Sequence, residues 1–358
     1  MAIRALAHIR QLCNLGLGSE AIMPALLKSI RELVRADSSA FFWIDPRGEM
    51  SNLYAERMLP PETMRRYFER YYTSPEHAFT QTVRRRVERG EFVVESSADP
   101  VFEATRYYDE ILRPLDAFRL LQGIVHDGPR VLGQLSLYRG RRSARFSSAD
   151  KQAVEAVTHY LRQCFVPSKK ARKDRSDAFR ASDEEALVVA SVEGEISAAS
   201  HRAYALLAHA SGEPINRDTM AGGVDRASRE LLRKVAGRLQ SRDQLSDTPP
   251  SLVVENSWGR YRLRAYALSQ FEMGVVIQRE EHLLVRVADA MLRLPLSAQQ
   301  REVALLLAQG MTNGEISKAM GVKMNTTSYH LKQLFAKLDA HDRSEAIAHI
   351  LDGHTMRG

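Results

Sequence analysis

Cysteine is scarce in this sequence of 358 residues, which contains only Cys13 and Cys164. Two cysteines cannot build a framework of several disulfides, and we expect buried free thiols, with a redox bridge between them as the alternative. The sequence also has no apolar run long enough to cross a membrane, and its N-terminus does not read as a secretory signal. We therefore expect a cytoplasmic protein that has no membrane partner.

Sequence motifs for catalysis and metal binding are missing as well. The chain has no Cys-x-x-Cys, His-Glu-x-x-His or Gly-x-Ser-x-Gly pattern, and no glycine-rich loop of the kind that holds phosphates. We also find no haem-ligand or flavin-cysteine motif. The sequence thus predicts a protein that is not an enzyme, with no catalytic residue, no metal site and no cofactor.

Three helical patterns follow one another near the C-terminus. The expected helices span residues 297–308, 312–320 and 324–338. Thr312 is followed by Glu315 three residues later, which is the pattern of a capping box at a helix start. Gly310 and Gly321 are placed to end the first two helices. Two short helices that meet at a sharp angle, with the second free to enter a groove, are typical of a helix-turn-helix.

This stretch resembles the DNA-binding domain of the LuxR-type (GerE-like) transcriptional regulators. The family pattern includes Leu-Leu-Ala-x-Gly, Ser/Thr-Asn-x-Glu-Ile, Thr-Val-x-x-His-Leu and Lys-Leu. The matching residues, in register and without gaps, are Leu296, Ser297, Glu302, Val303, Leu306, Leu307, Ala308, Gly310, Thr312, Asn313, Glu315, Ile316, Thr326, His330, Leu331, Lys337 and Leu338, and Arg343 and Ala346 extend the match. The resemblance implies a four-helix domain at residues 296–358 that binds double-stranded DNA. It also implies a homodimer formed through the last helix, at Ile347, Ile350 and Leu351.

The third helix is expected to bury one stripe of side chains and to present the opposite side to DNA. The buried stripe is Thr327, Leu331, Leu334 and Leu338. The predicted DNA-binding residues are Thr312, Asn313, Lys323, Asn325, Thr326, Ser328, Tyr329, Lys332, Gln333 and Lys337. We expect Asn325, Ser328 or Tyr329, and Lys332 to read bases, because amide, hydroxyl and ammonium groups match base edges. Thr312, Asn313, Lys323 and Lys337 are expected to contact phosphate, and the alternative for several of these residues is a solvated side chain.

Positive charge is concentrated outside this domain. The chain carries a net charge of +7, and residues 139–180 alone carry +8, whereas residues 295–358 carry +1. Ser328 and Gly314 stand where the family often has a basic residue, and Asp339 replaces a usual glycine. Two hypotheses follow: a ligand-responsive dimeric transcription factor, or a regulator that acts through protein contacts after losing most DNA binding.

A basic linker is expected at residues 166–182. Its cations include Lys169, Lys170, Arg172 and Lys173. The linker is either a solvated tether or a second contact with DNA phosphates. If the second interpretation is correct, neutralising these four residues lowers both the DNA affinity and its salt dependence.

Residues 1–165 are expected to fold into helices around an antiparallel sheet. Helices are expected at 2–13, 20–35, 60–71, 107–112 and 147–165, and strands at 39–45, 50–54, 92–95, 118–126 and 131–138. This order resembles a GAF-like α/β sensory domain, which implies a small-molecule ligand. Trp43, Tyr54, Tyr71, Tyr72 and Phe79 are the candidate ligand-binding residues. The alternative is that these aromatic residues pack in the core.

Residues 183–281 are expected to form a second α/β domain. Strands are expected at 186–192, 195–198, 251–257, 260–268 and 274–278, and helices at 200–209 and 228–239. The order resembles a PAS-like domain and leaves ligand binding, dimerisation and a structural role open. A connecting helix at 282–295 should dock on this sheet or pair across a dimer through Leu284, Val287 or Ala288, and Met291. The predicted fold class is a multidomain α+β chain that ends in an all-α helix-turn-helix domain.

Overall fold

The computed structural model describes residues 2–74, 79–165, 179–220, 223–241 and 249–353. These residues form two compact units. The first contains residues 2–165 and 181–280, and the second contains residues 281–353 together with residues 179–180. No helix in the described ranges is long and apolar enough to span a membrane. Most of the expected basic linker, including its four named cations, lies outside the described residues.

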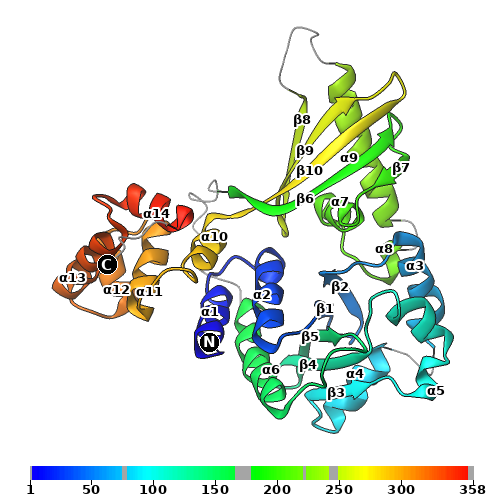
Figure 1. The fold of residues 1–358 in the computed structure, drawn as a ribbon, viewed down its shortest axis with the longest axis horizontal. Coiled ribbons are helices and arrows are strands. Elements are labelled where there is room, and N and C mark those ends of the chain that lie inside the picture. The colour runs from blue at the N-terminus through cyan, green and yellow to red at the C-terminus, as the bar shows by residue number, and fades with distance from the viewer. Residues whose placement is uncertain (1, 75–78, 166–178, 221–222, 242–248, 354–358) are drawn as a thin grey trace. The chain divides into compact units, whose positions relative to one another are not determined.

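The N-terminal half of the first unit is built around sheet A. Its elements are α1 (Ala2–Cys13), α2 (Ser19–Val34), β1 (Ser38–Ile44), β2 (Met50–Ala55), α3 (Pro61–Arg66), η1 (Tyr67–Tyr71), α4 (Phe79–Glu88), β3 (Val93–Ser97), α5 (Pro100–Glu103), η2 (Tyr108–Leu112), β4 (Arg119–Asp127), β5 (Arg130–Arg139), α6 (Ser148–Leu161) and η3 (Arg162–Phe165). The strand order is β2-β1-β5-β4-β3, and the neighbouring strands are antiparallel. Helices α1, α2 and α6 pack together on one face of this sheet (Figure 1).

The segment between β2 and β4 differs most from the expectation. Helix α4 was not expected, and two predicted helical turns are π-helices, η1 and η2. In η1 the N–H of Tyr72 donates to the carbonyl oxygen of Tyr67, five residues earlier, at 3.0 Å. A buried arginine explains the position of α4: Arg86 donates to the side-chain oxygens of Gln122 and Gln134 on sheet A. These contacts join residues about 40 positions apart, so local periodicity could not reveal them.

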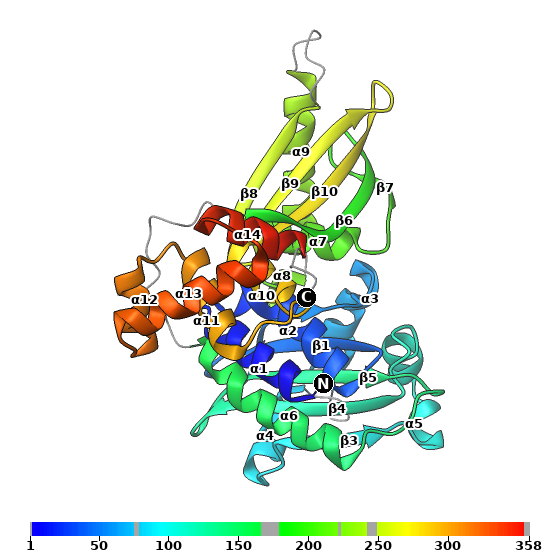
Figure 2. The same ribbon diagram turned by 60° about the vertical axis from the view of Figure 1, so that its left-hand side comes forward.

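The remainder of the first unit is built around sheet B. Its elements are β6 (Phe179–Ser191), β7 (Ile196–Ala199), α7 (Ala203–Ser211), α8 (Arg217–Met220), α9 (Gly223–Gln240), β8 (Ser251–Asn256), β9 (Gly259–Ala267) and β10 (Glu272–His282). The strand order is β7-β6-β10-β9-β8, the same relative order as in sheet A. Helices α7 and α9 pack on one face, and Figure 2 shows α9 behind β8 and β9. Strand β6 begins at Phe179, inside the expected linker.

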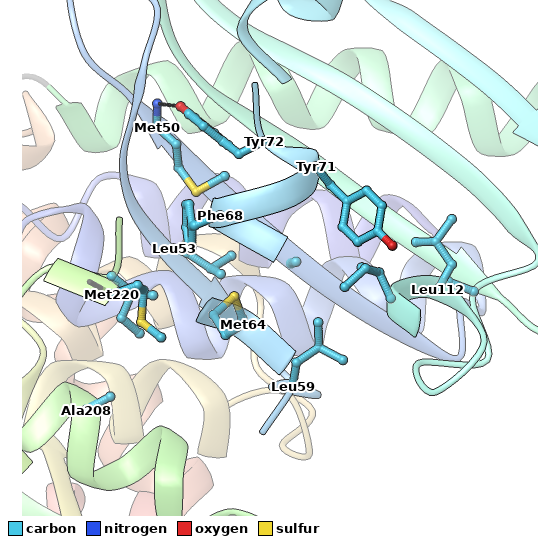
Figure 3. Packing of buried hydrophobic residues seen from close by; sticks show 14 of the residues in the cluster. Met50, Leu53, Leu59, Met64, Phe68, Tyr71, Tyr72, Leu112, Ala208 and Met220 are labelled. Atoms are coloured by element: carbon cyan, nitrogen blue, oxygen red, sulfur yellow. Dashed lines mark hydrogen bonds between the residues drawn. The ribbon is translucent and has the colours of Figure 1, made fainter. Parts of the chain in front are cut away.

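The two sheets share a hydrophobic core, although the sequence predicted two separate domains. Met50, Leu53 and Met64 from the first half pack in one buried cluster with Ala208 and Met220 from the second half (Figure 3). Short helices α3 and α8 lie against each other at this junction. Burial of this apolar surface stabilises the association of the two halves of the first unit, because the favourable free energy of burial scales with the area removed from water.

The second unit contains five helices among its described residues: α10 (Leu283–Ala290), α11 (Ala298–Ala308), α12 (Asn313–Met320), α13 (Met324–Leu338) and α14 (Arg343–Asp352). The helix expected at 282–295 is shorter than predicted and packs against α11 and α14. Its stripe of Leu284, Val287 and Met291 is buried. Because these side chains are already buried within one copy of the chain, the expectation that they pair across a dimer was wrong. The stripe completes the core of the C-terminal helices instead.

Candidate nucleic-acid interface

Side-chain caps fix the ends of the helices that build this interface. Thr312 and Glu315 form the expected capping box at α12, with the Thr312 N–H donating to the Glu315 carboxylate at 2.8 Å. Ser297 and Gln300 form another at α11. Helix α12 ends at Gly321, whose φ of 65° is left-handed and therefore favours glycine. Helix α13 then begins at Met324, as predicted.

Helix α13 has one buried and one exposed face. The predicted stripe of Thr327, Leu331, Leu334 and Leu338 is buried, as expected. The exposed residues include seven of the predicted DNA-binding residues, namely the N-cap Lys323 and Asn325, Thr326, Ser328, Tyr329, Lys332 and Gln333. Asn325, Ser328 and Lys332 follow one another at spacings of three and four residues, so their side chains lie on one side of the helix. The structure thus brings the predicted base-reading residues together on an accessible surface.

Three of the predicted phosphate contacts already have partners within the domain. Thr312 is the N-cap of α12. The side-chain oxygen of Asn313 accepts a hydrogen bond from Arg343. The ammonium group of Lys337 lies 3.4 Å from the Gln300 side-chain oxygen and is half-buried. These three side chains therefore help to hold the domain together, whereas Lys323 at the start of α13 is exposed.

A surface hollow of about 540 Å³ lies beside the exposed face of α13. It is lined by Asn313, Ser328, Leu331, Lys332, Phe335, Ala336, Ala340, His341 and Arg343. Lys332 and Arg343 give this lining positive charge, and it contains no acidic side chain. Arg343 also donates to the Met311 carbonyl oxygen. Sequence reasoning missed Arg343 as a site residue because the packing of α14 on α13 brings it beside Asn313, 30 residues earlier.

The last helix contributes part of its apolar surface to the domain itself. Ile350 is buried, whereas Ile347 and Leu351 are half-buried. Helix α14 packs against α10, α11 and α13. Ile350 is thus a core residue, and the surface that the family resemblance assigns to dimerisation is left with Ile347 and Leu351.

The five candidate ligand-binding aromatics do not gather in one place. Tyr71, Tyr72 and Phe79 belong to a packed cluster on the crossover side of sheet A, where the ring centroids of Tyr72 and Phe79 are 6.1 Å apart. The Tyr72 hydroxyl accepts a hydrogen bond from the Met50 N–H at 2.8 Å (Figure 3). It donates another to the Glu49 carboxylate, also at 2.8 Å. Tyr72 is therefore a structural residue that connects η1 to β2.

Trp43 and Tyr54 lie at the junction of the two sheets. The Trp43 ring is 5.4 Å from Trp258 of the second sheet, and its N–H donates to the Ser19 hydroxyl. The ring of Tyr54 stacks on His209 at 5.1 Å. Burial raises the pKa of Tyr54, and the nearby Glu184 carboxylate raises it further. Both aromatic side chains are almost fully buried, which favours the core interpretation for these two residues.

A second hollow of about 510 Å³ lies on the first unit, between α6 and the strands β3 and β4. Phe92 and His126 stack on its wall with ring centroids 4.2 Å apart. None of the five candidate ligand residues lines it. Within the described ranges, no three His, Cys, Asp or Glu side chains are grouped so that they could hold a metal ion. Cys13 and Cys164 are both buried and free, and contact with the Cys13 thiol raises the pKa of Cys164.

Comparison with known proteins identifies the C-terminal helices. Residues 294–350 match the family model of the bacterial regulatory proteins of the luxR family (GerE). The chain is 43% identical over 53 residues to SgaR of Hyphomicrobium methylovorum, and 39% identical over 51 residues to YhjB of Escherichia coli strain K12. The names of both proteins describe transcriptional regulators. These alignments cover 15% and 14% of this chain, and 25% and 26% of the respective relatives.

The chain thus spans about a quarter of the length of the curated relatives that it matches. Among solved structures, the sensor region of a sensor histidine kinase aligns with 45% of this chain and 63% of its own length, at 15% identity. Its TM-score of 0.17 is too low for an inference about the fold. The capped helices, the two-faced α13 and the family match agree, and the C-terminal segment at residues 294–350 is a helix-turn-helix domain of the luxR family.

Proposed function

We propose that this protein is a transcriptional regulator that binds double-stranded DNA through α13. The observation that carries the proposal is the exposed face of α13, where Asn325, Ser328 and Lys332 lie on one side while the opposite stripe is buried. An α-helix fits the major groove of DNA, where ammonium and amide side chains can distinguish base pairs. Tyr329, Thr326 and Gln333 are exposed beside this row and belong to the same proposed contact surface. The proposal requires no catalysis and no cofactor.

Phosphate contacts are proposed at Lys323 and at the cationic hollow that contains Lys332 and Arg343. Arg343 is held by two neutral oxygen atoms, those of Met311 and Asn313, so that no carboxylate among these contacts neutralises it. A cation fixed beside the reading helix orients the domain on the DNA backbone without specifying the sequence. Thr312, Asn313 and Lys337 then act indirectly, because they position the helices.

A homodimer is part of the proposal. Residues 295–358 carry a net charge of only +1, so one copy gains little free energy from phosphate neutralisation. Two copies that bind half-sites about one DNA turn, ~34–36 Å, apart would add their contacts. Ile347 and Leu351 of α14 remain the proposed contact between the two helix-turn-helix domains.

The upstream unit is proposed to have a sensory role, with GAF-like and PAS-like halves that respond to a small molecule or another signal. Support comes from the order of elements, which is the same in both sheets. Strand β10 ends at His282 and α10 begins at Leu283, with the His282 ring accepting from the Leu284 N–H at 3.2 Å. In this proposal, the signal would pass along that direct connection in the chain from β10 to α10.

The DNA-binding proposal is tested by mobility-shift assays with DNA from upstream of the protein's own gene. Lys332→Ala should weaken binding at least about fivefold, since one good contact to a base contributes ~1–3 kcal/mol. Lys234→Ala removes the same charge from the exposed surface of α9 and is the matched control, with unchanged binding expected. Equal loss in both variants would show that the effect is one of net charge and not of the reading face.

A regulator that acts mainly through protein contacts is the second candidate. It is favoured by Ser328 at a position where the family often has a basic residue and by the involvement of Lys337 with Gln300. This candidate predicts no sequence-selective shift even at low salt. A selective shift that Lys332→Ala abolishes would rule it out.

A further inference from the structure

The two large hydrophobic side chains that the second unit exposes among its described residues both lie on α13. Met324 is 48% exposed and Tyr329 is 60% exposed. The other exposed side chains of this kind, such as Leu268, belong to the first unit. Single exposed apolar side chains are common on protein surfaces, so the position of these two on the proposed reading helix is the informative feature.

Met324 is the first residue of α13 and begins a row of side chains that faces outward. Ser328 follows it by four residues and Lys332 follows Ser328 by four, so the three side chains lie on one side of the helix in successive turns. All three are exposed. In a helix-turn-helix, the N-terminal residues of the second helix contact base edges. Met324 therefore belongs to the part of α13 that should meet the bases, although it was not among the predicted DNA-binding residues.

Gly314 of α12 leaves the end of the Met324 side chain uncovered. A Cβ atom at position 314 would lie 3.6 Å from the Met324 Cε atom, which is ordinary van der Waals contact. The family often has a basic residue at this position. A long cationic side chain there would lie against the Met324 methyl group and place a charge beside it. With glycine, the methyl group keeps an apolar and accessible surface.

The next residue of the row is uncharged as well. Ser328 stands where the family often has a basic residue, so the row carries no positive charge before Lys332. Residues 295–358 carry a net charge of only +1, and phosphate neutralisation therefore contributes little to binding. Apolar contact is thus the interaction that Met324 offers to DNA.

Thymine is the base whose edge in the major groove matches this apolar surface. It presents a C5 methyl group there, whereas the other three bases present hydrogen-bond donors and acceptors. The thioether of methionine is only a weak acceptor and has no donor, so it gains little from those polar edges. Its flexible side chain can adapt to the position of a methyl group in the groove.

We propose that Met324 contacts the C5 methyl group of a thymine and makes the protein selective for an A·T pair at that position of its DNA site. This inference rests on the proposed DNA-binding function, and it assigns a base to one residue of the reading face. Met324 and the thymine methyl group exclude water from each other, whereas Lys332 reads a base edge through hydrogen bonds. Removal of either apolar group exposes the other, so the two removals should not be additive.

The test uses the full chain and DNA duplexes that the wild type selects from a random-sequence library. Each thymine of the selected site is replaced in turn by uracil, which pairs with adenine in the same way but lacks the C5 methyl group. At one thymine position we expect the wild type to lose affinity about fourfold, the effect of losing one buried methyl group. Met324→Ala should bind the thymine duplex at least about fourfold more weakly than the wild type. It should not distinguish thymine from uracil at that position.

Two further variants serve as controls. Leu268→Ala removes a side chain that is 59% exposed on the first unit, and it should keep both the affinity and the response to uracil. Met324→Leu keeps an apolar side chain of similar size and should still respond to uracil. The response of the wild type needs no substitution, so an unstable variant leaves that result intact.

The outcomes separate this inference from the function on which it rests. A wild type that responds to uracil at no thymine would overturn the methyl contact, and so would an equal response in the wild type and Met324→Ala. Failure of the library to yield any preferred sequence would instead overturn the proposed DNA-binding function, and the thymine contact with it.

Discussion

The guanidinium group of Arg279 donates a 2.8 Å hydrogen bond to the carboxylate of Glu184, with both side chains almost enclosed. Arg279 also donates to the carbonyl oxygens of Ala21 and Trp258, and the Tyr54 hydroxyl lies 3.3 Å from Glu184. Ala21 and Tyr54 belong to the first half of the unit, and the other three residues belong to the second. The ion pair therefore anchors the junction of the two sheets.

Glu184→Gln should destabilise the first unit by about 3–5 kcal/mol, because it leaves the buried Arg279 charge without its counter-charge. Burial alone would raise the pKa of Glu184. The positive charges of Arg279 and Arg202 have the larger combined effect, so that the pKa is lowered. A lowered folded-state pKa means that the stabilisation is complete above the unfolded pKa of about 4.3 and is lost as the pH falls through the folded value. Urea denaturation should thus show that the free energy of unfolding of Glu184→Gln is much lower than that of wild type at pH 7. The difference between the two proteins should be smaller below pH 4.

Glu193→Gln removes an exposed carboxylate and is the control, with a change within about 0.5 kcal/mol expected. A loss in Glu184→Gln no larger than in this control would contradict the anchoring role of the pair.

His209 should make the stability of the first unit depend on pH in a range where most carboxylates stay charged. Burial lowers its pKa to about 3; Glu184 acts against this shift and Arg279 adds to it. Its ring lies between Tyr54 at 5.1 Å and Trp258 at 4.4 Å. Because the unfolded chain binds the proton first, stability is complete above about pH 6.5 and falls by up to ~1.4 kcal/mol per pH unit toward pH 3.

His209→Phe keeps a flat ring in this stack and removes the titration. The slope of unfolding free energy against pH, measured from pH 6 to pH 4.5, should be smaller than in wild type by up to ~1.4 kcal/mol per pH unit, which corresponds to one proton. The other charged groups near the ring are Glu184, Arg279 and Arg202, and they are unchanged in this variant. An identical slope in both proteins would show that His209 is protonated in the folded state.

Thr327 is fully buried in α13, and its hydroxyl has no hydrogen-bond partner in the described part of the chain. The luxR-family pattern has valine at this position. Thr327→Val replaces a desolvated hydroxyl with a methyl group of similar size and should stabilise the C-terminal unit by about 1 kcal/mol. Thermal unfolding measures this gain, while DNA affinity should not change because the side chain faces inward. A lower unfolding temperature would mean that the hydroxyl forms an interaction that the valine loses.

Local signals explain which parts of the fold the sequence predicted well. The helix-turn-helix boundaries follow from neighbouring residues: Thr312 with Glu315 at the start of α12, and Gly321 at its end. The buried stripe of α13 follows from helical spacing. The exposed position of Lys332 is the complement of that stripe. These features need no knowledge of the rest of the chain.

Features that depend on distant residues were missed. The contact between Tyr54 and Glu184 joins positions 130 residues apart, and it is one of the contacts between the two expected domains, which lie in one compact unit. Strand β10 extends to His282 because it pairs with β9 as far as Glu280 and Arg260, and this shortened the expected connecting helix. Arg343 reached the candidate site only through the packing of α14. Pairing partners across a sheet or between helices are not encoded in local periodicity.

Asp339 offers a test of how the departures from the family pattern affect DNA binding. It follows the last residue of α13 with a φ of 53° and a ψ of 47°, the left-handed conformation that glycine adopts without strain. Its negative charge also lies at the negative end of the helix dipole. Asp339→Gly removes both the backbone strain and the unfavourable charge, and it should stabilise the C-terminal unit by about 1 kcal/mol. It should also strengthen DNA binding a few-fold at low salt, because one negative charge near the DNA is lost.

Asp339→Asn separates the two effects, because asparagine removes the charge and tolerates the left-handed conformation less well than glycine. Both variants should therefore strengthen DNA binding equally in mobility-shift titrations. The unfolding temperature should be highest for Asp339→Gly, intermediate for Asp339→Asn and lowest for the wild type. The gain in affinity should disappear as salt is raised, since it is electrostatic. Stronger binding by the glycine variant alone would assign the effect of Asp339 to the backbone at the end of α13 and not to its charge.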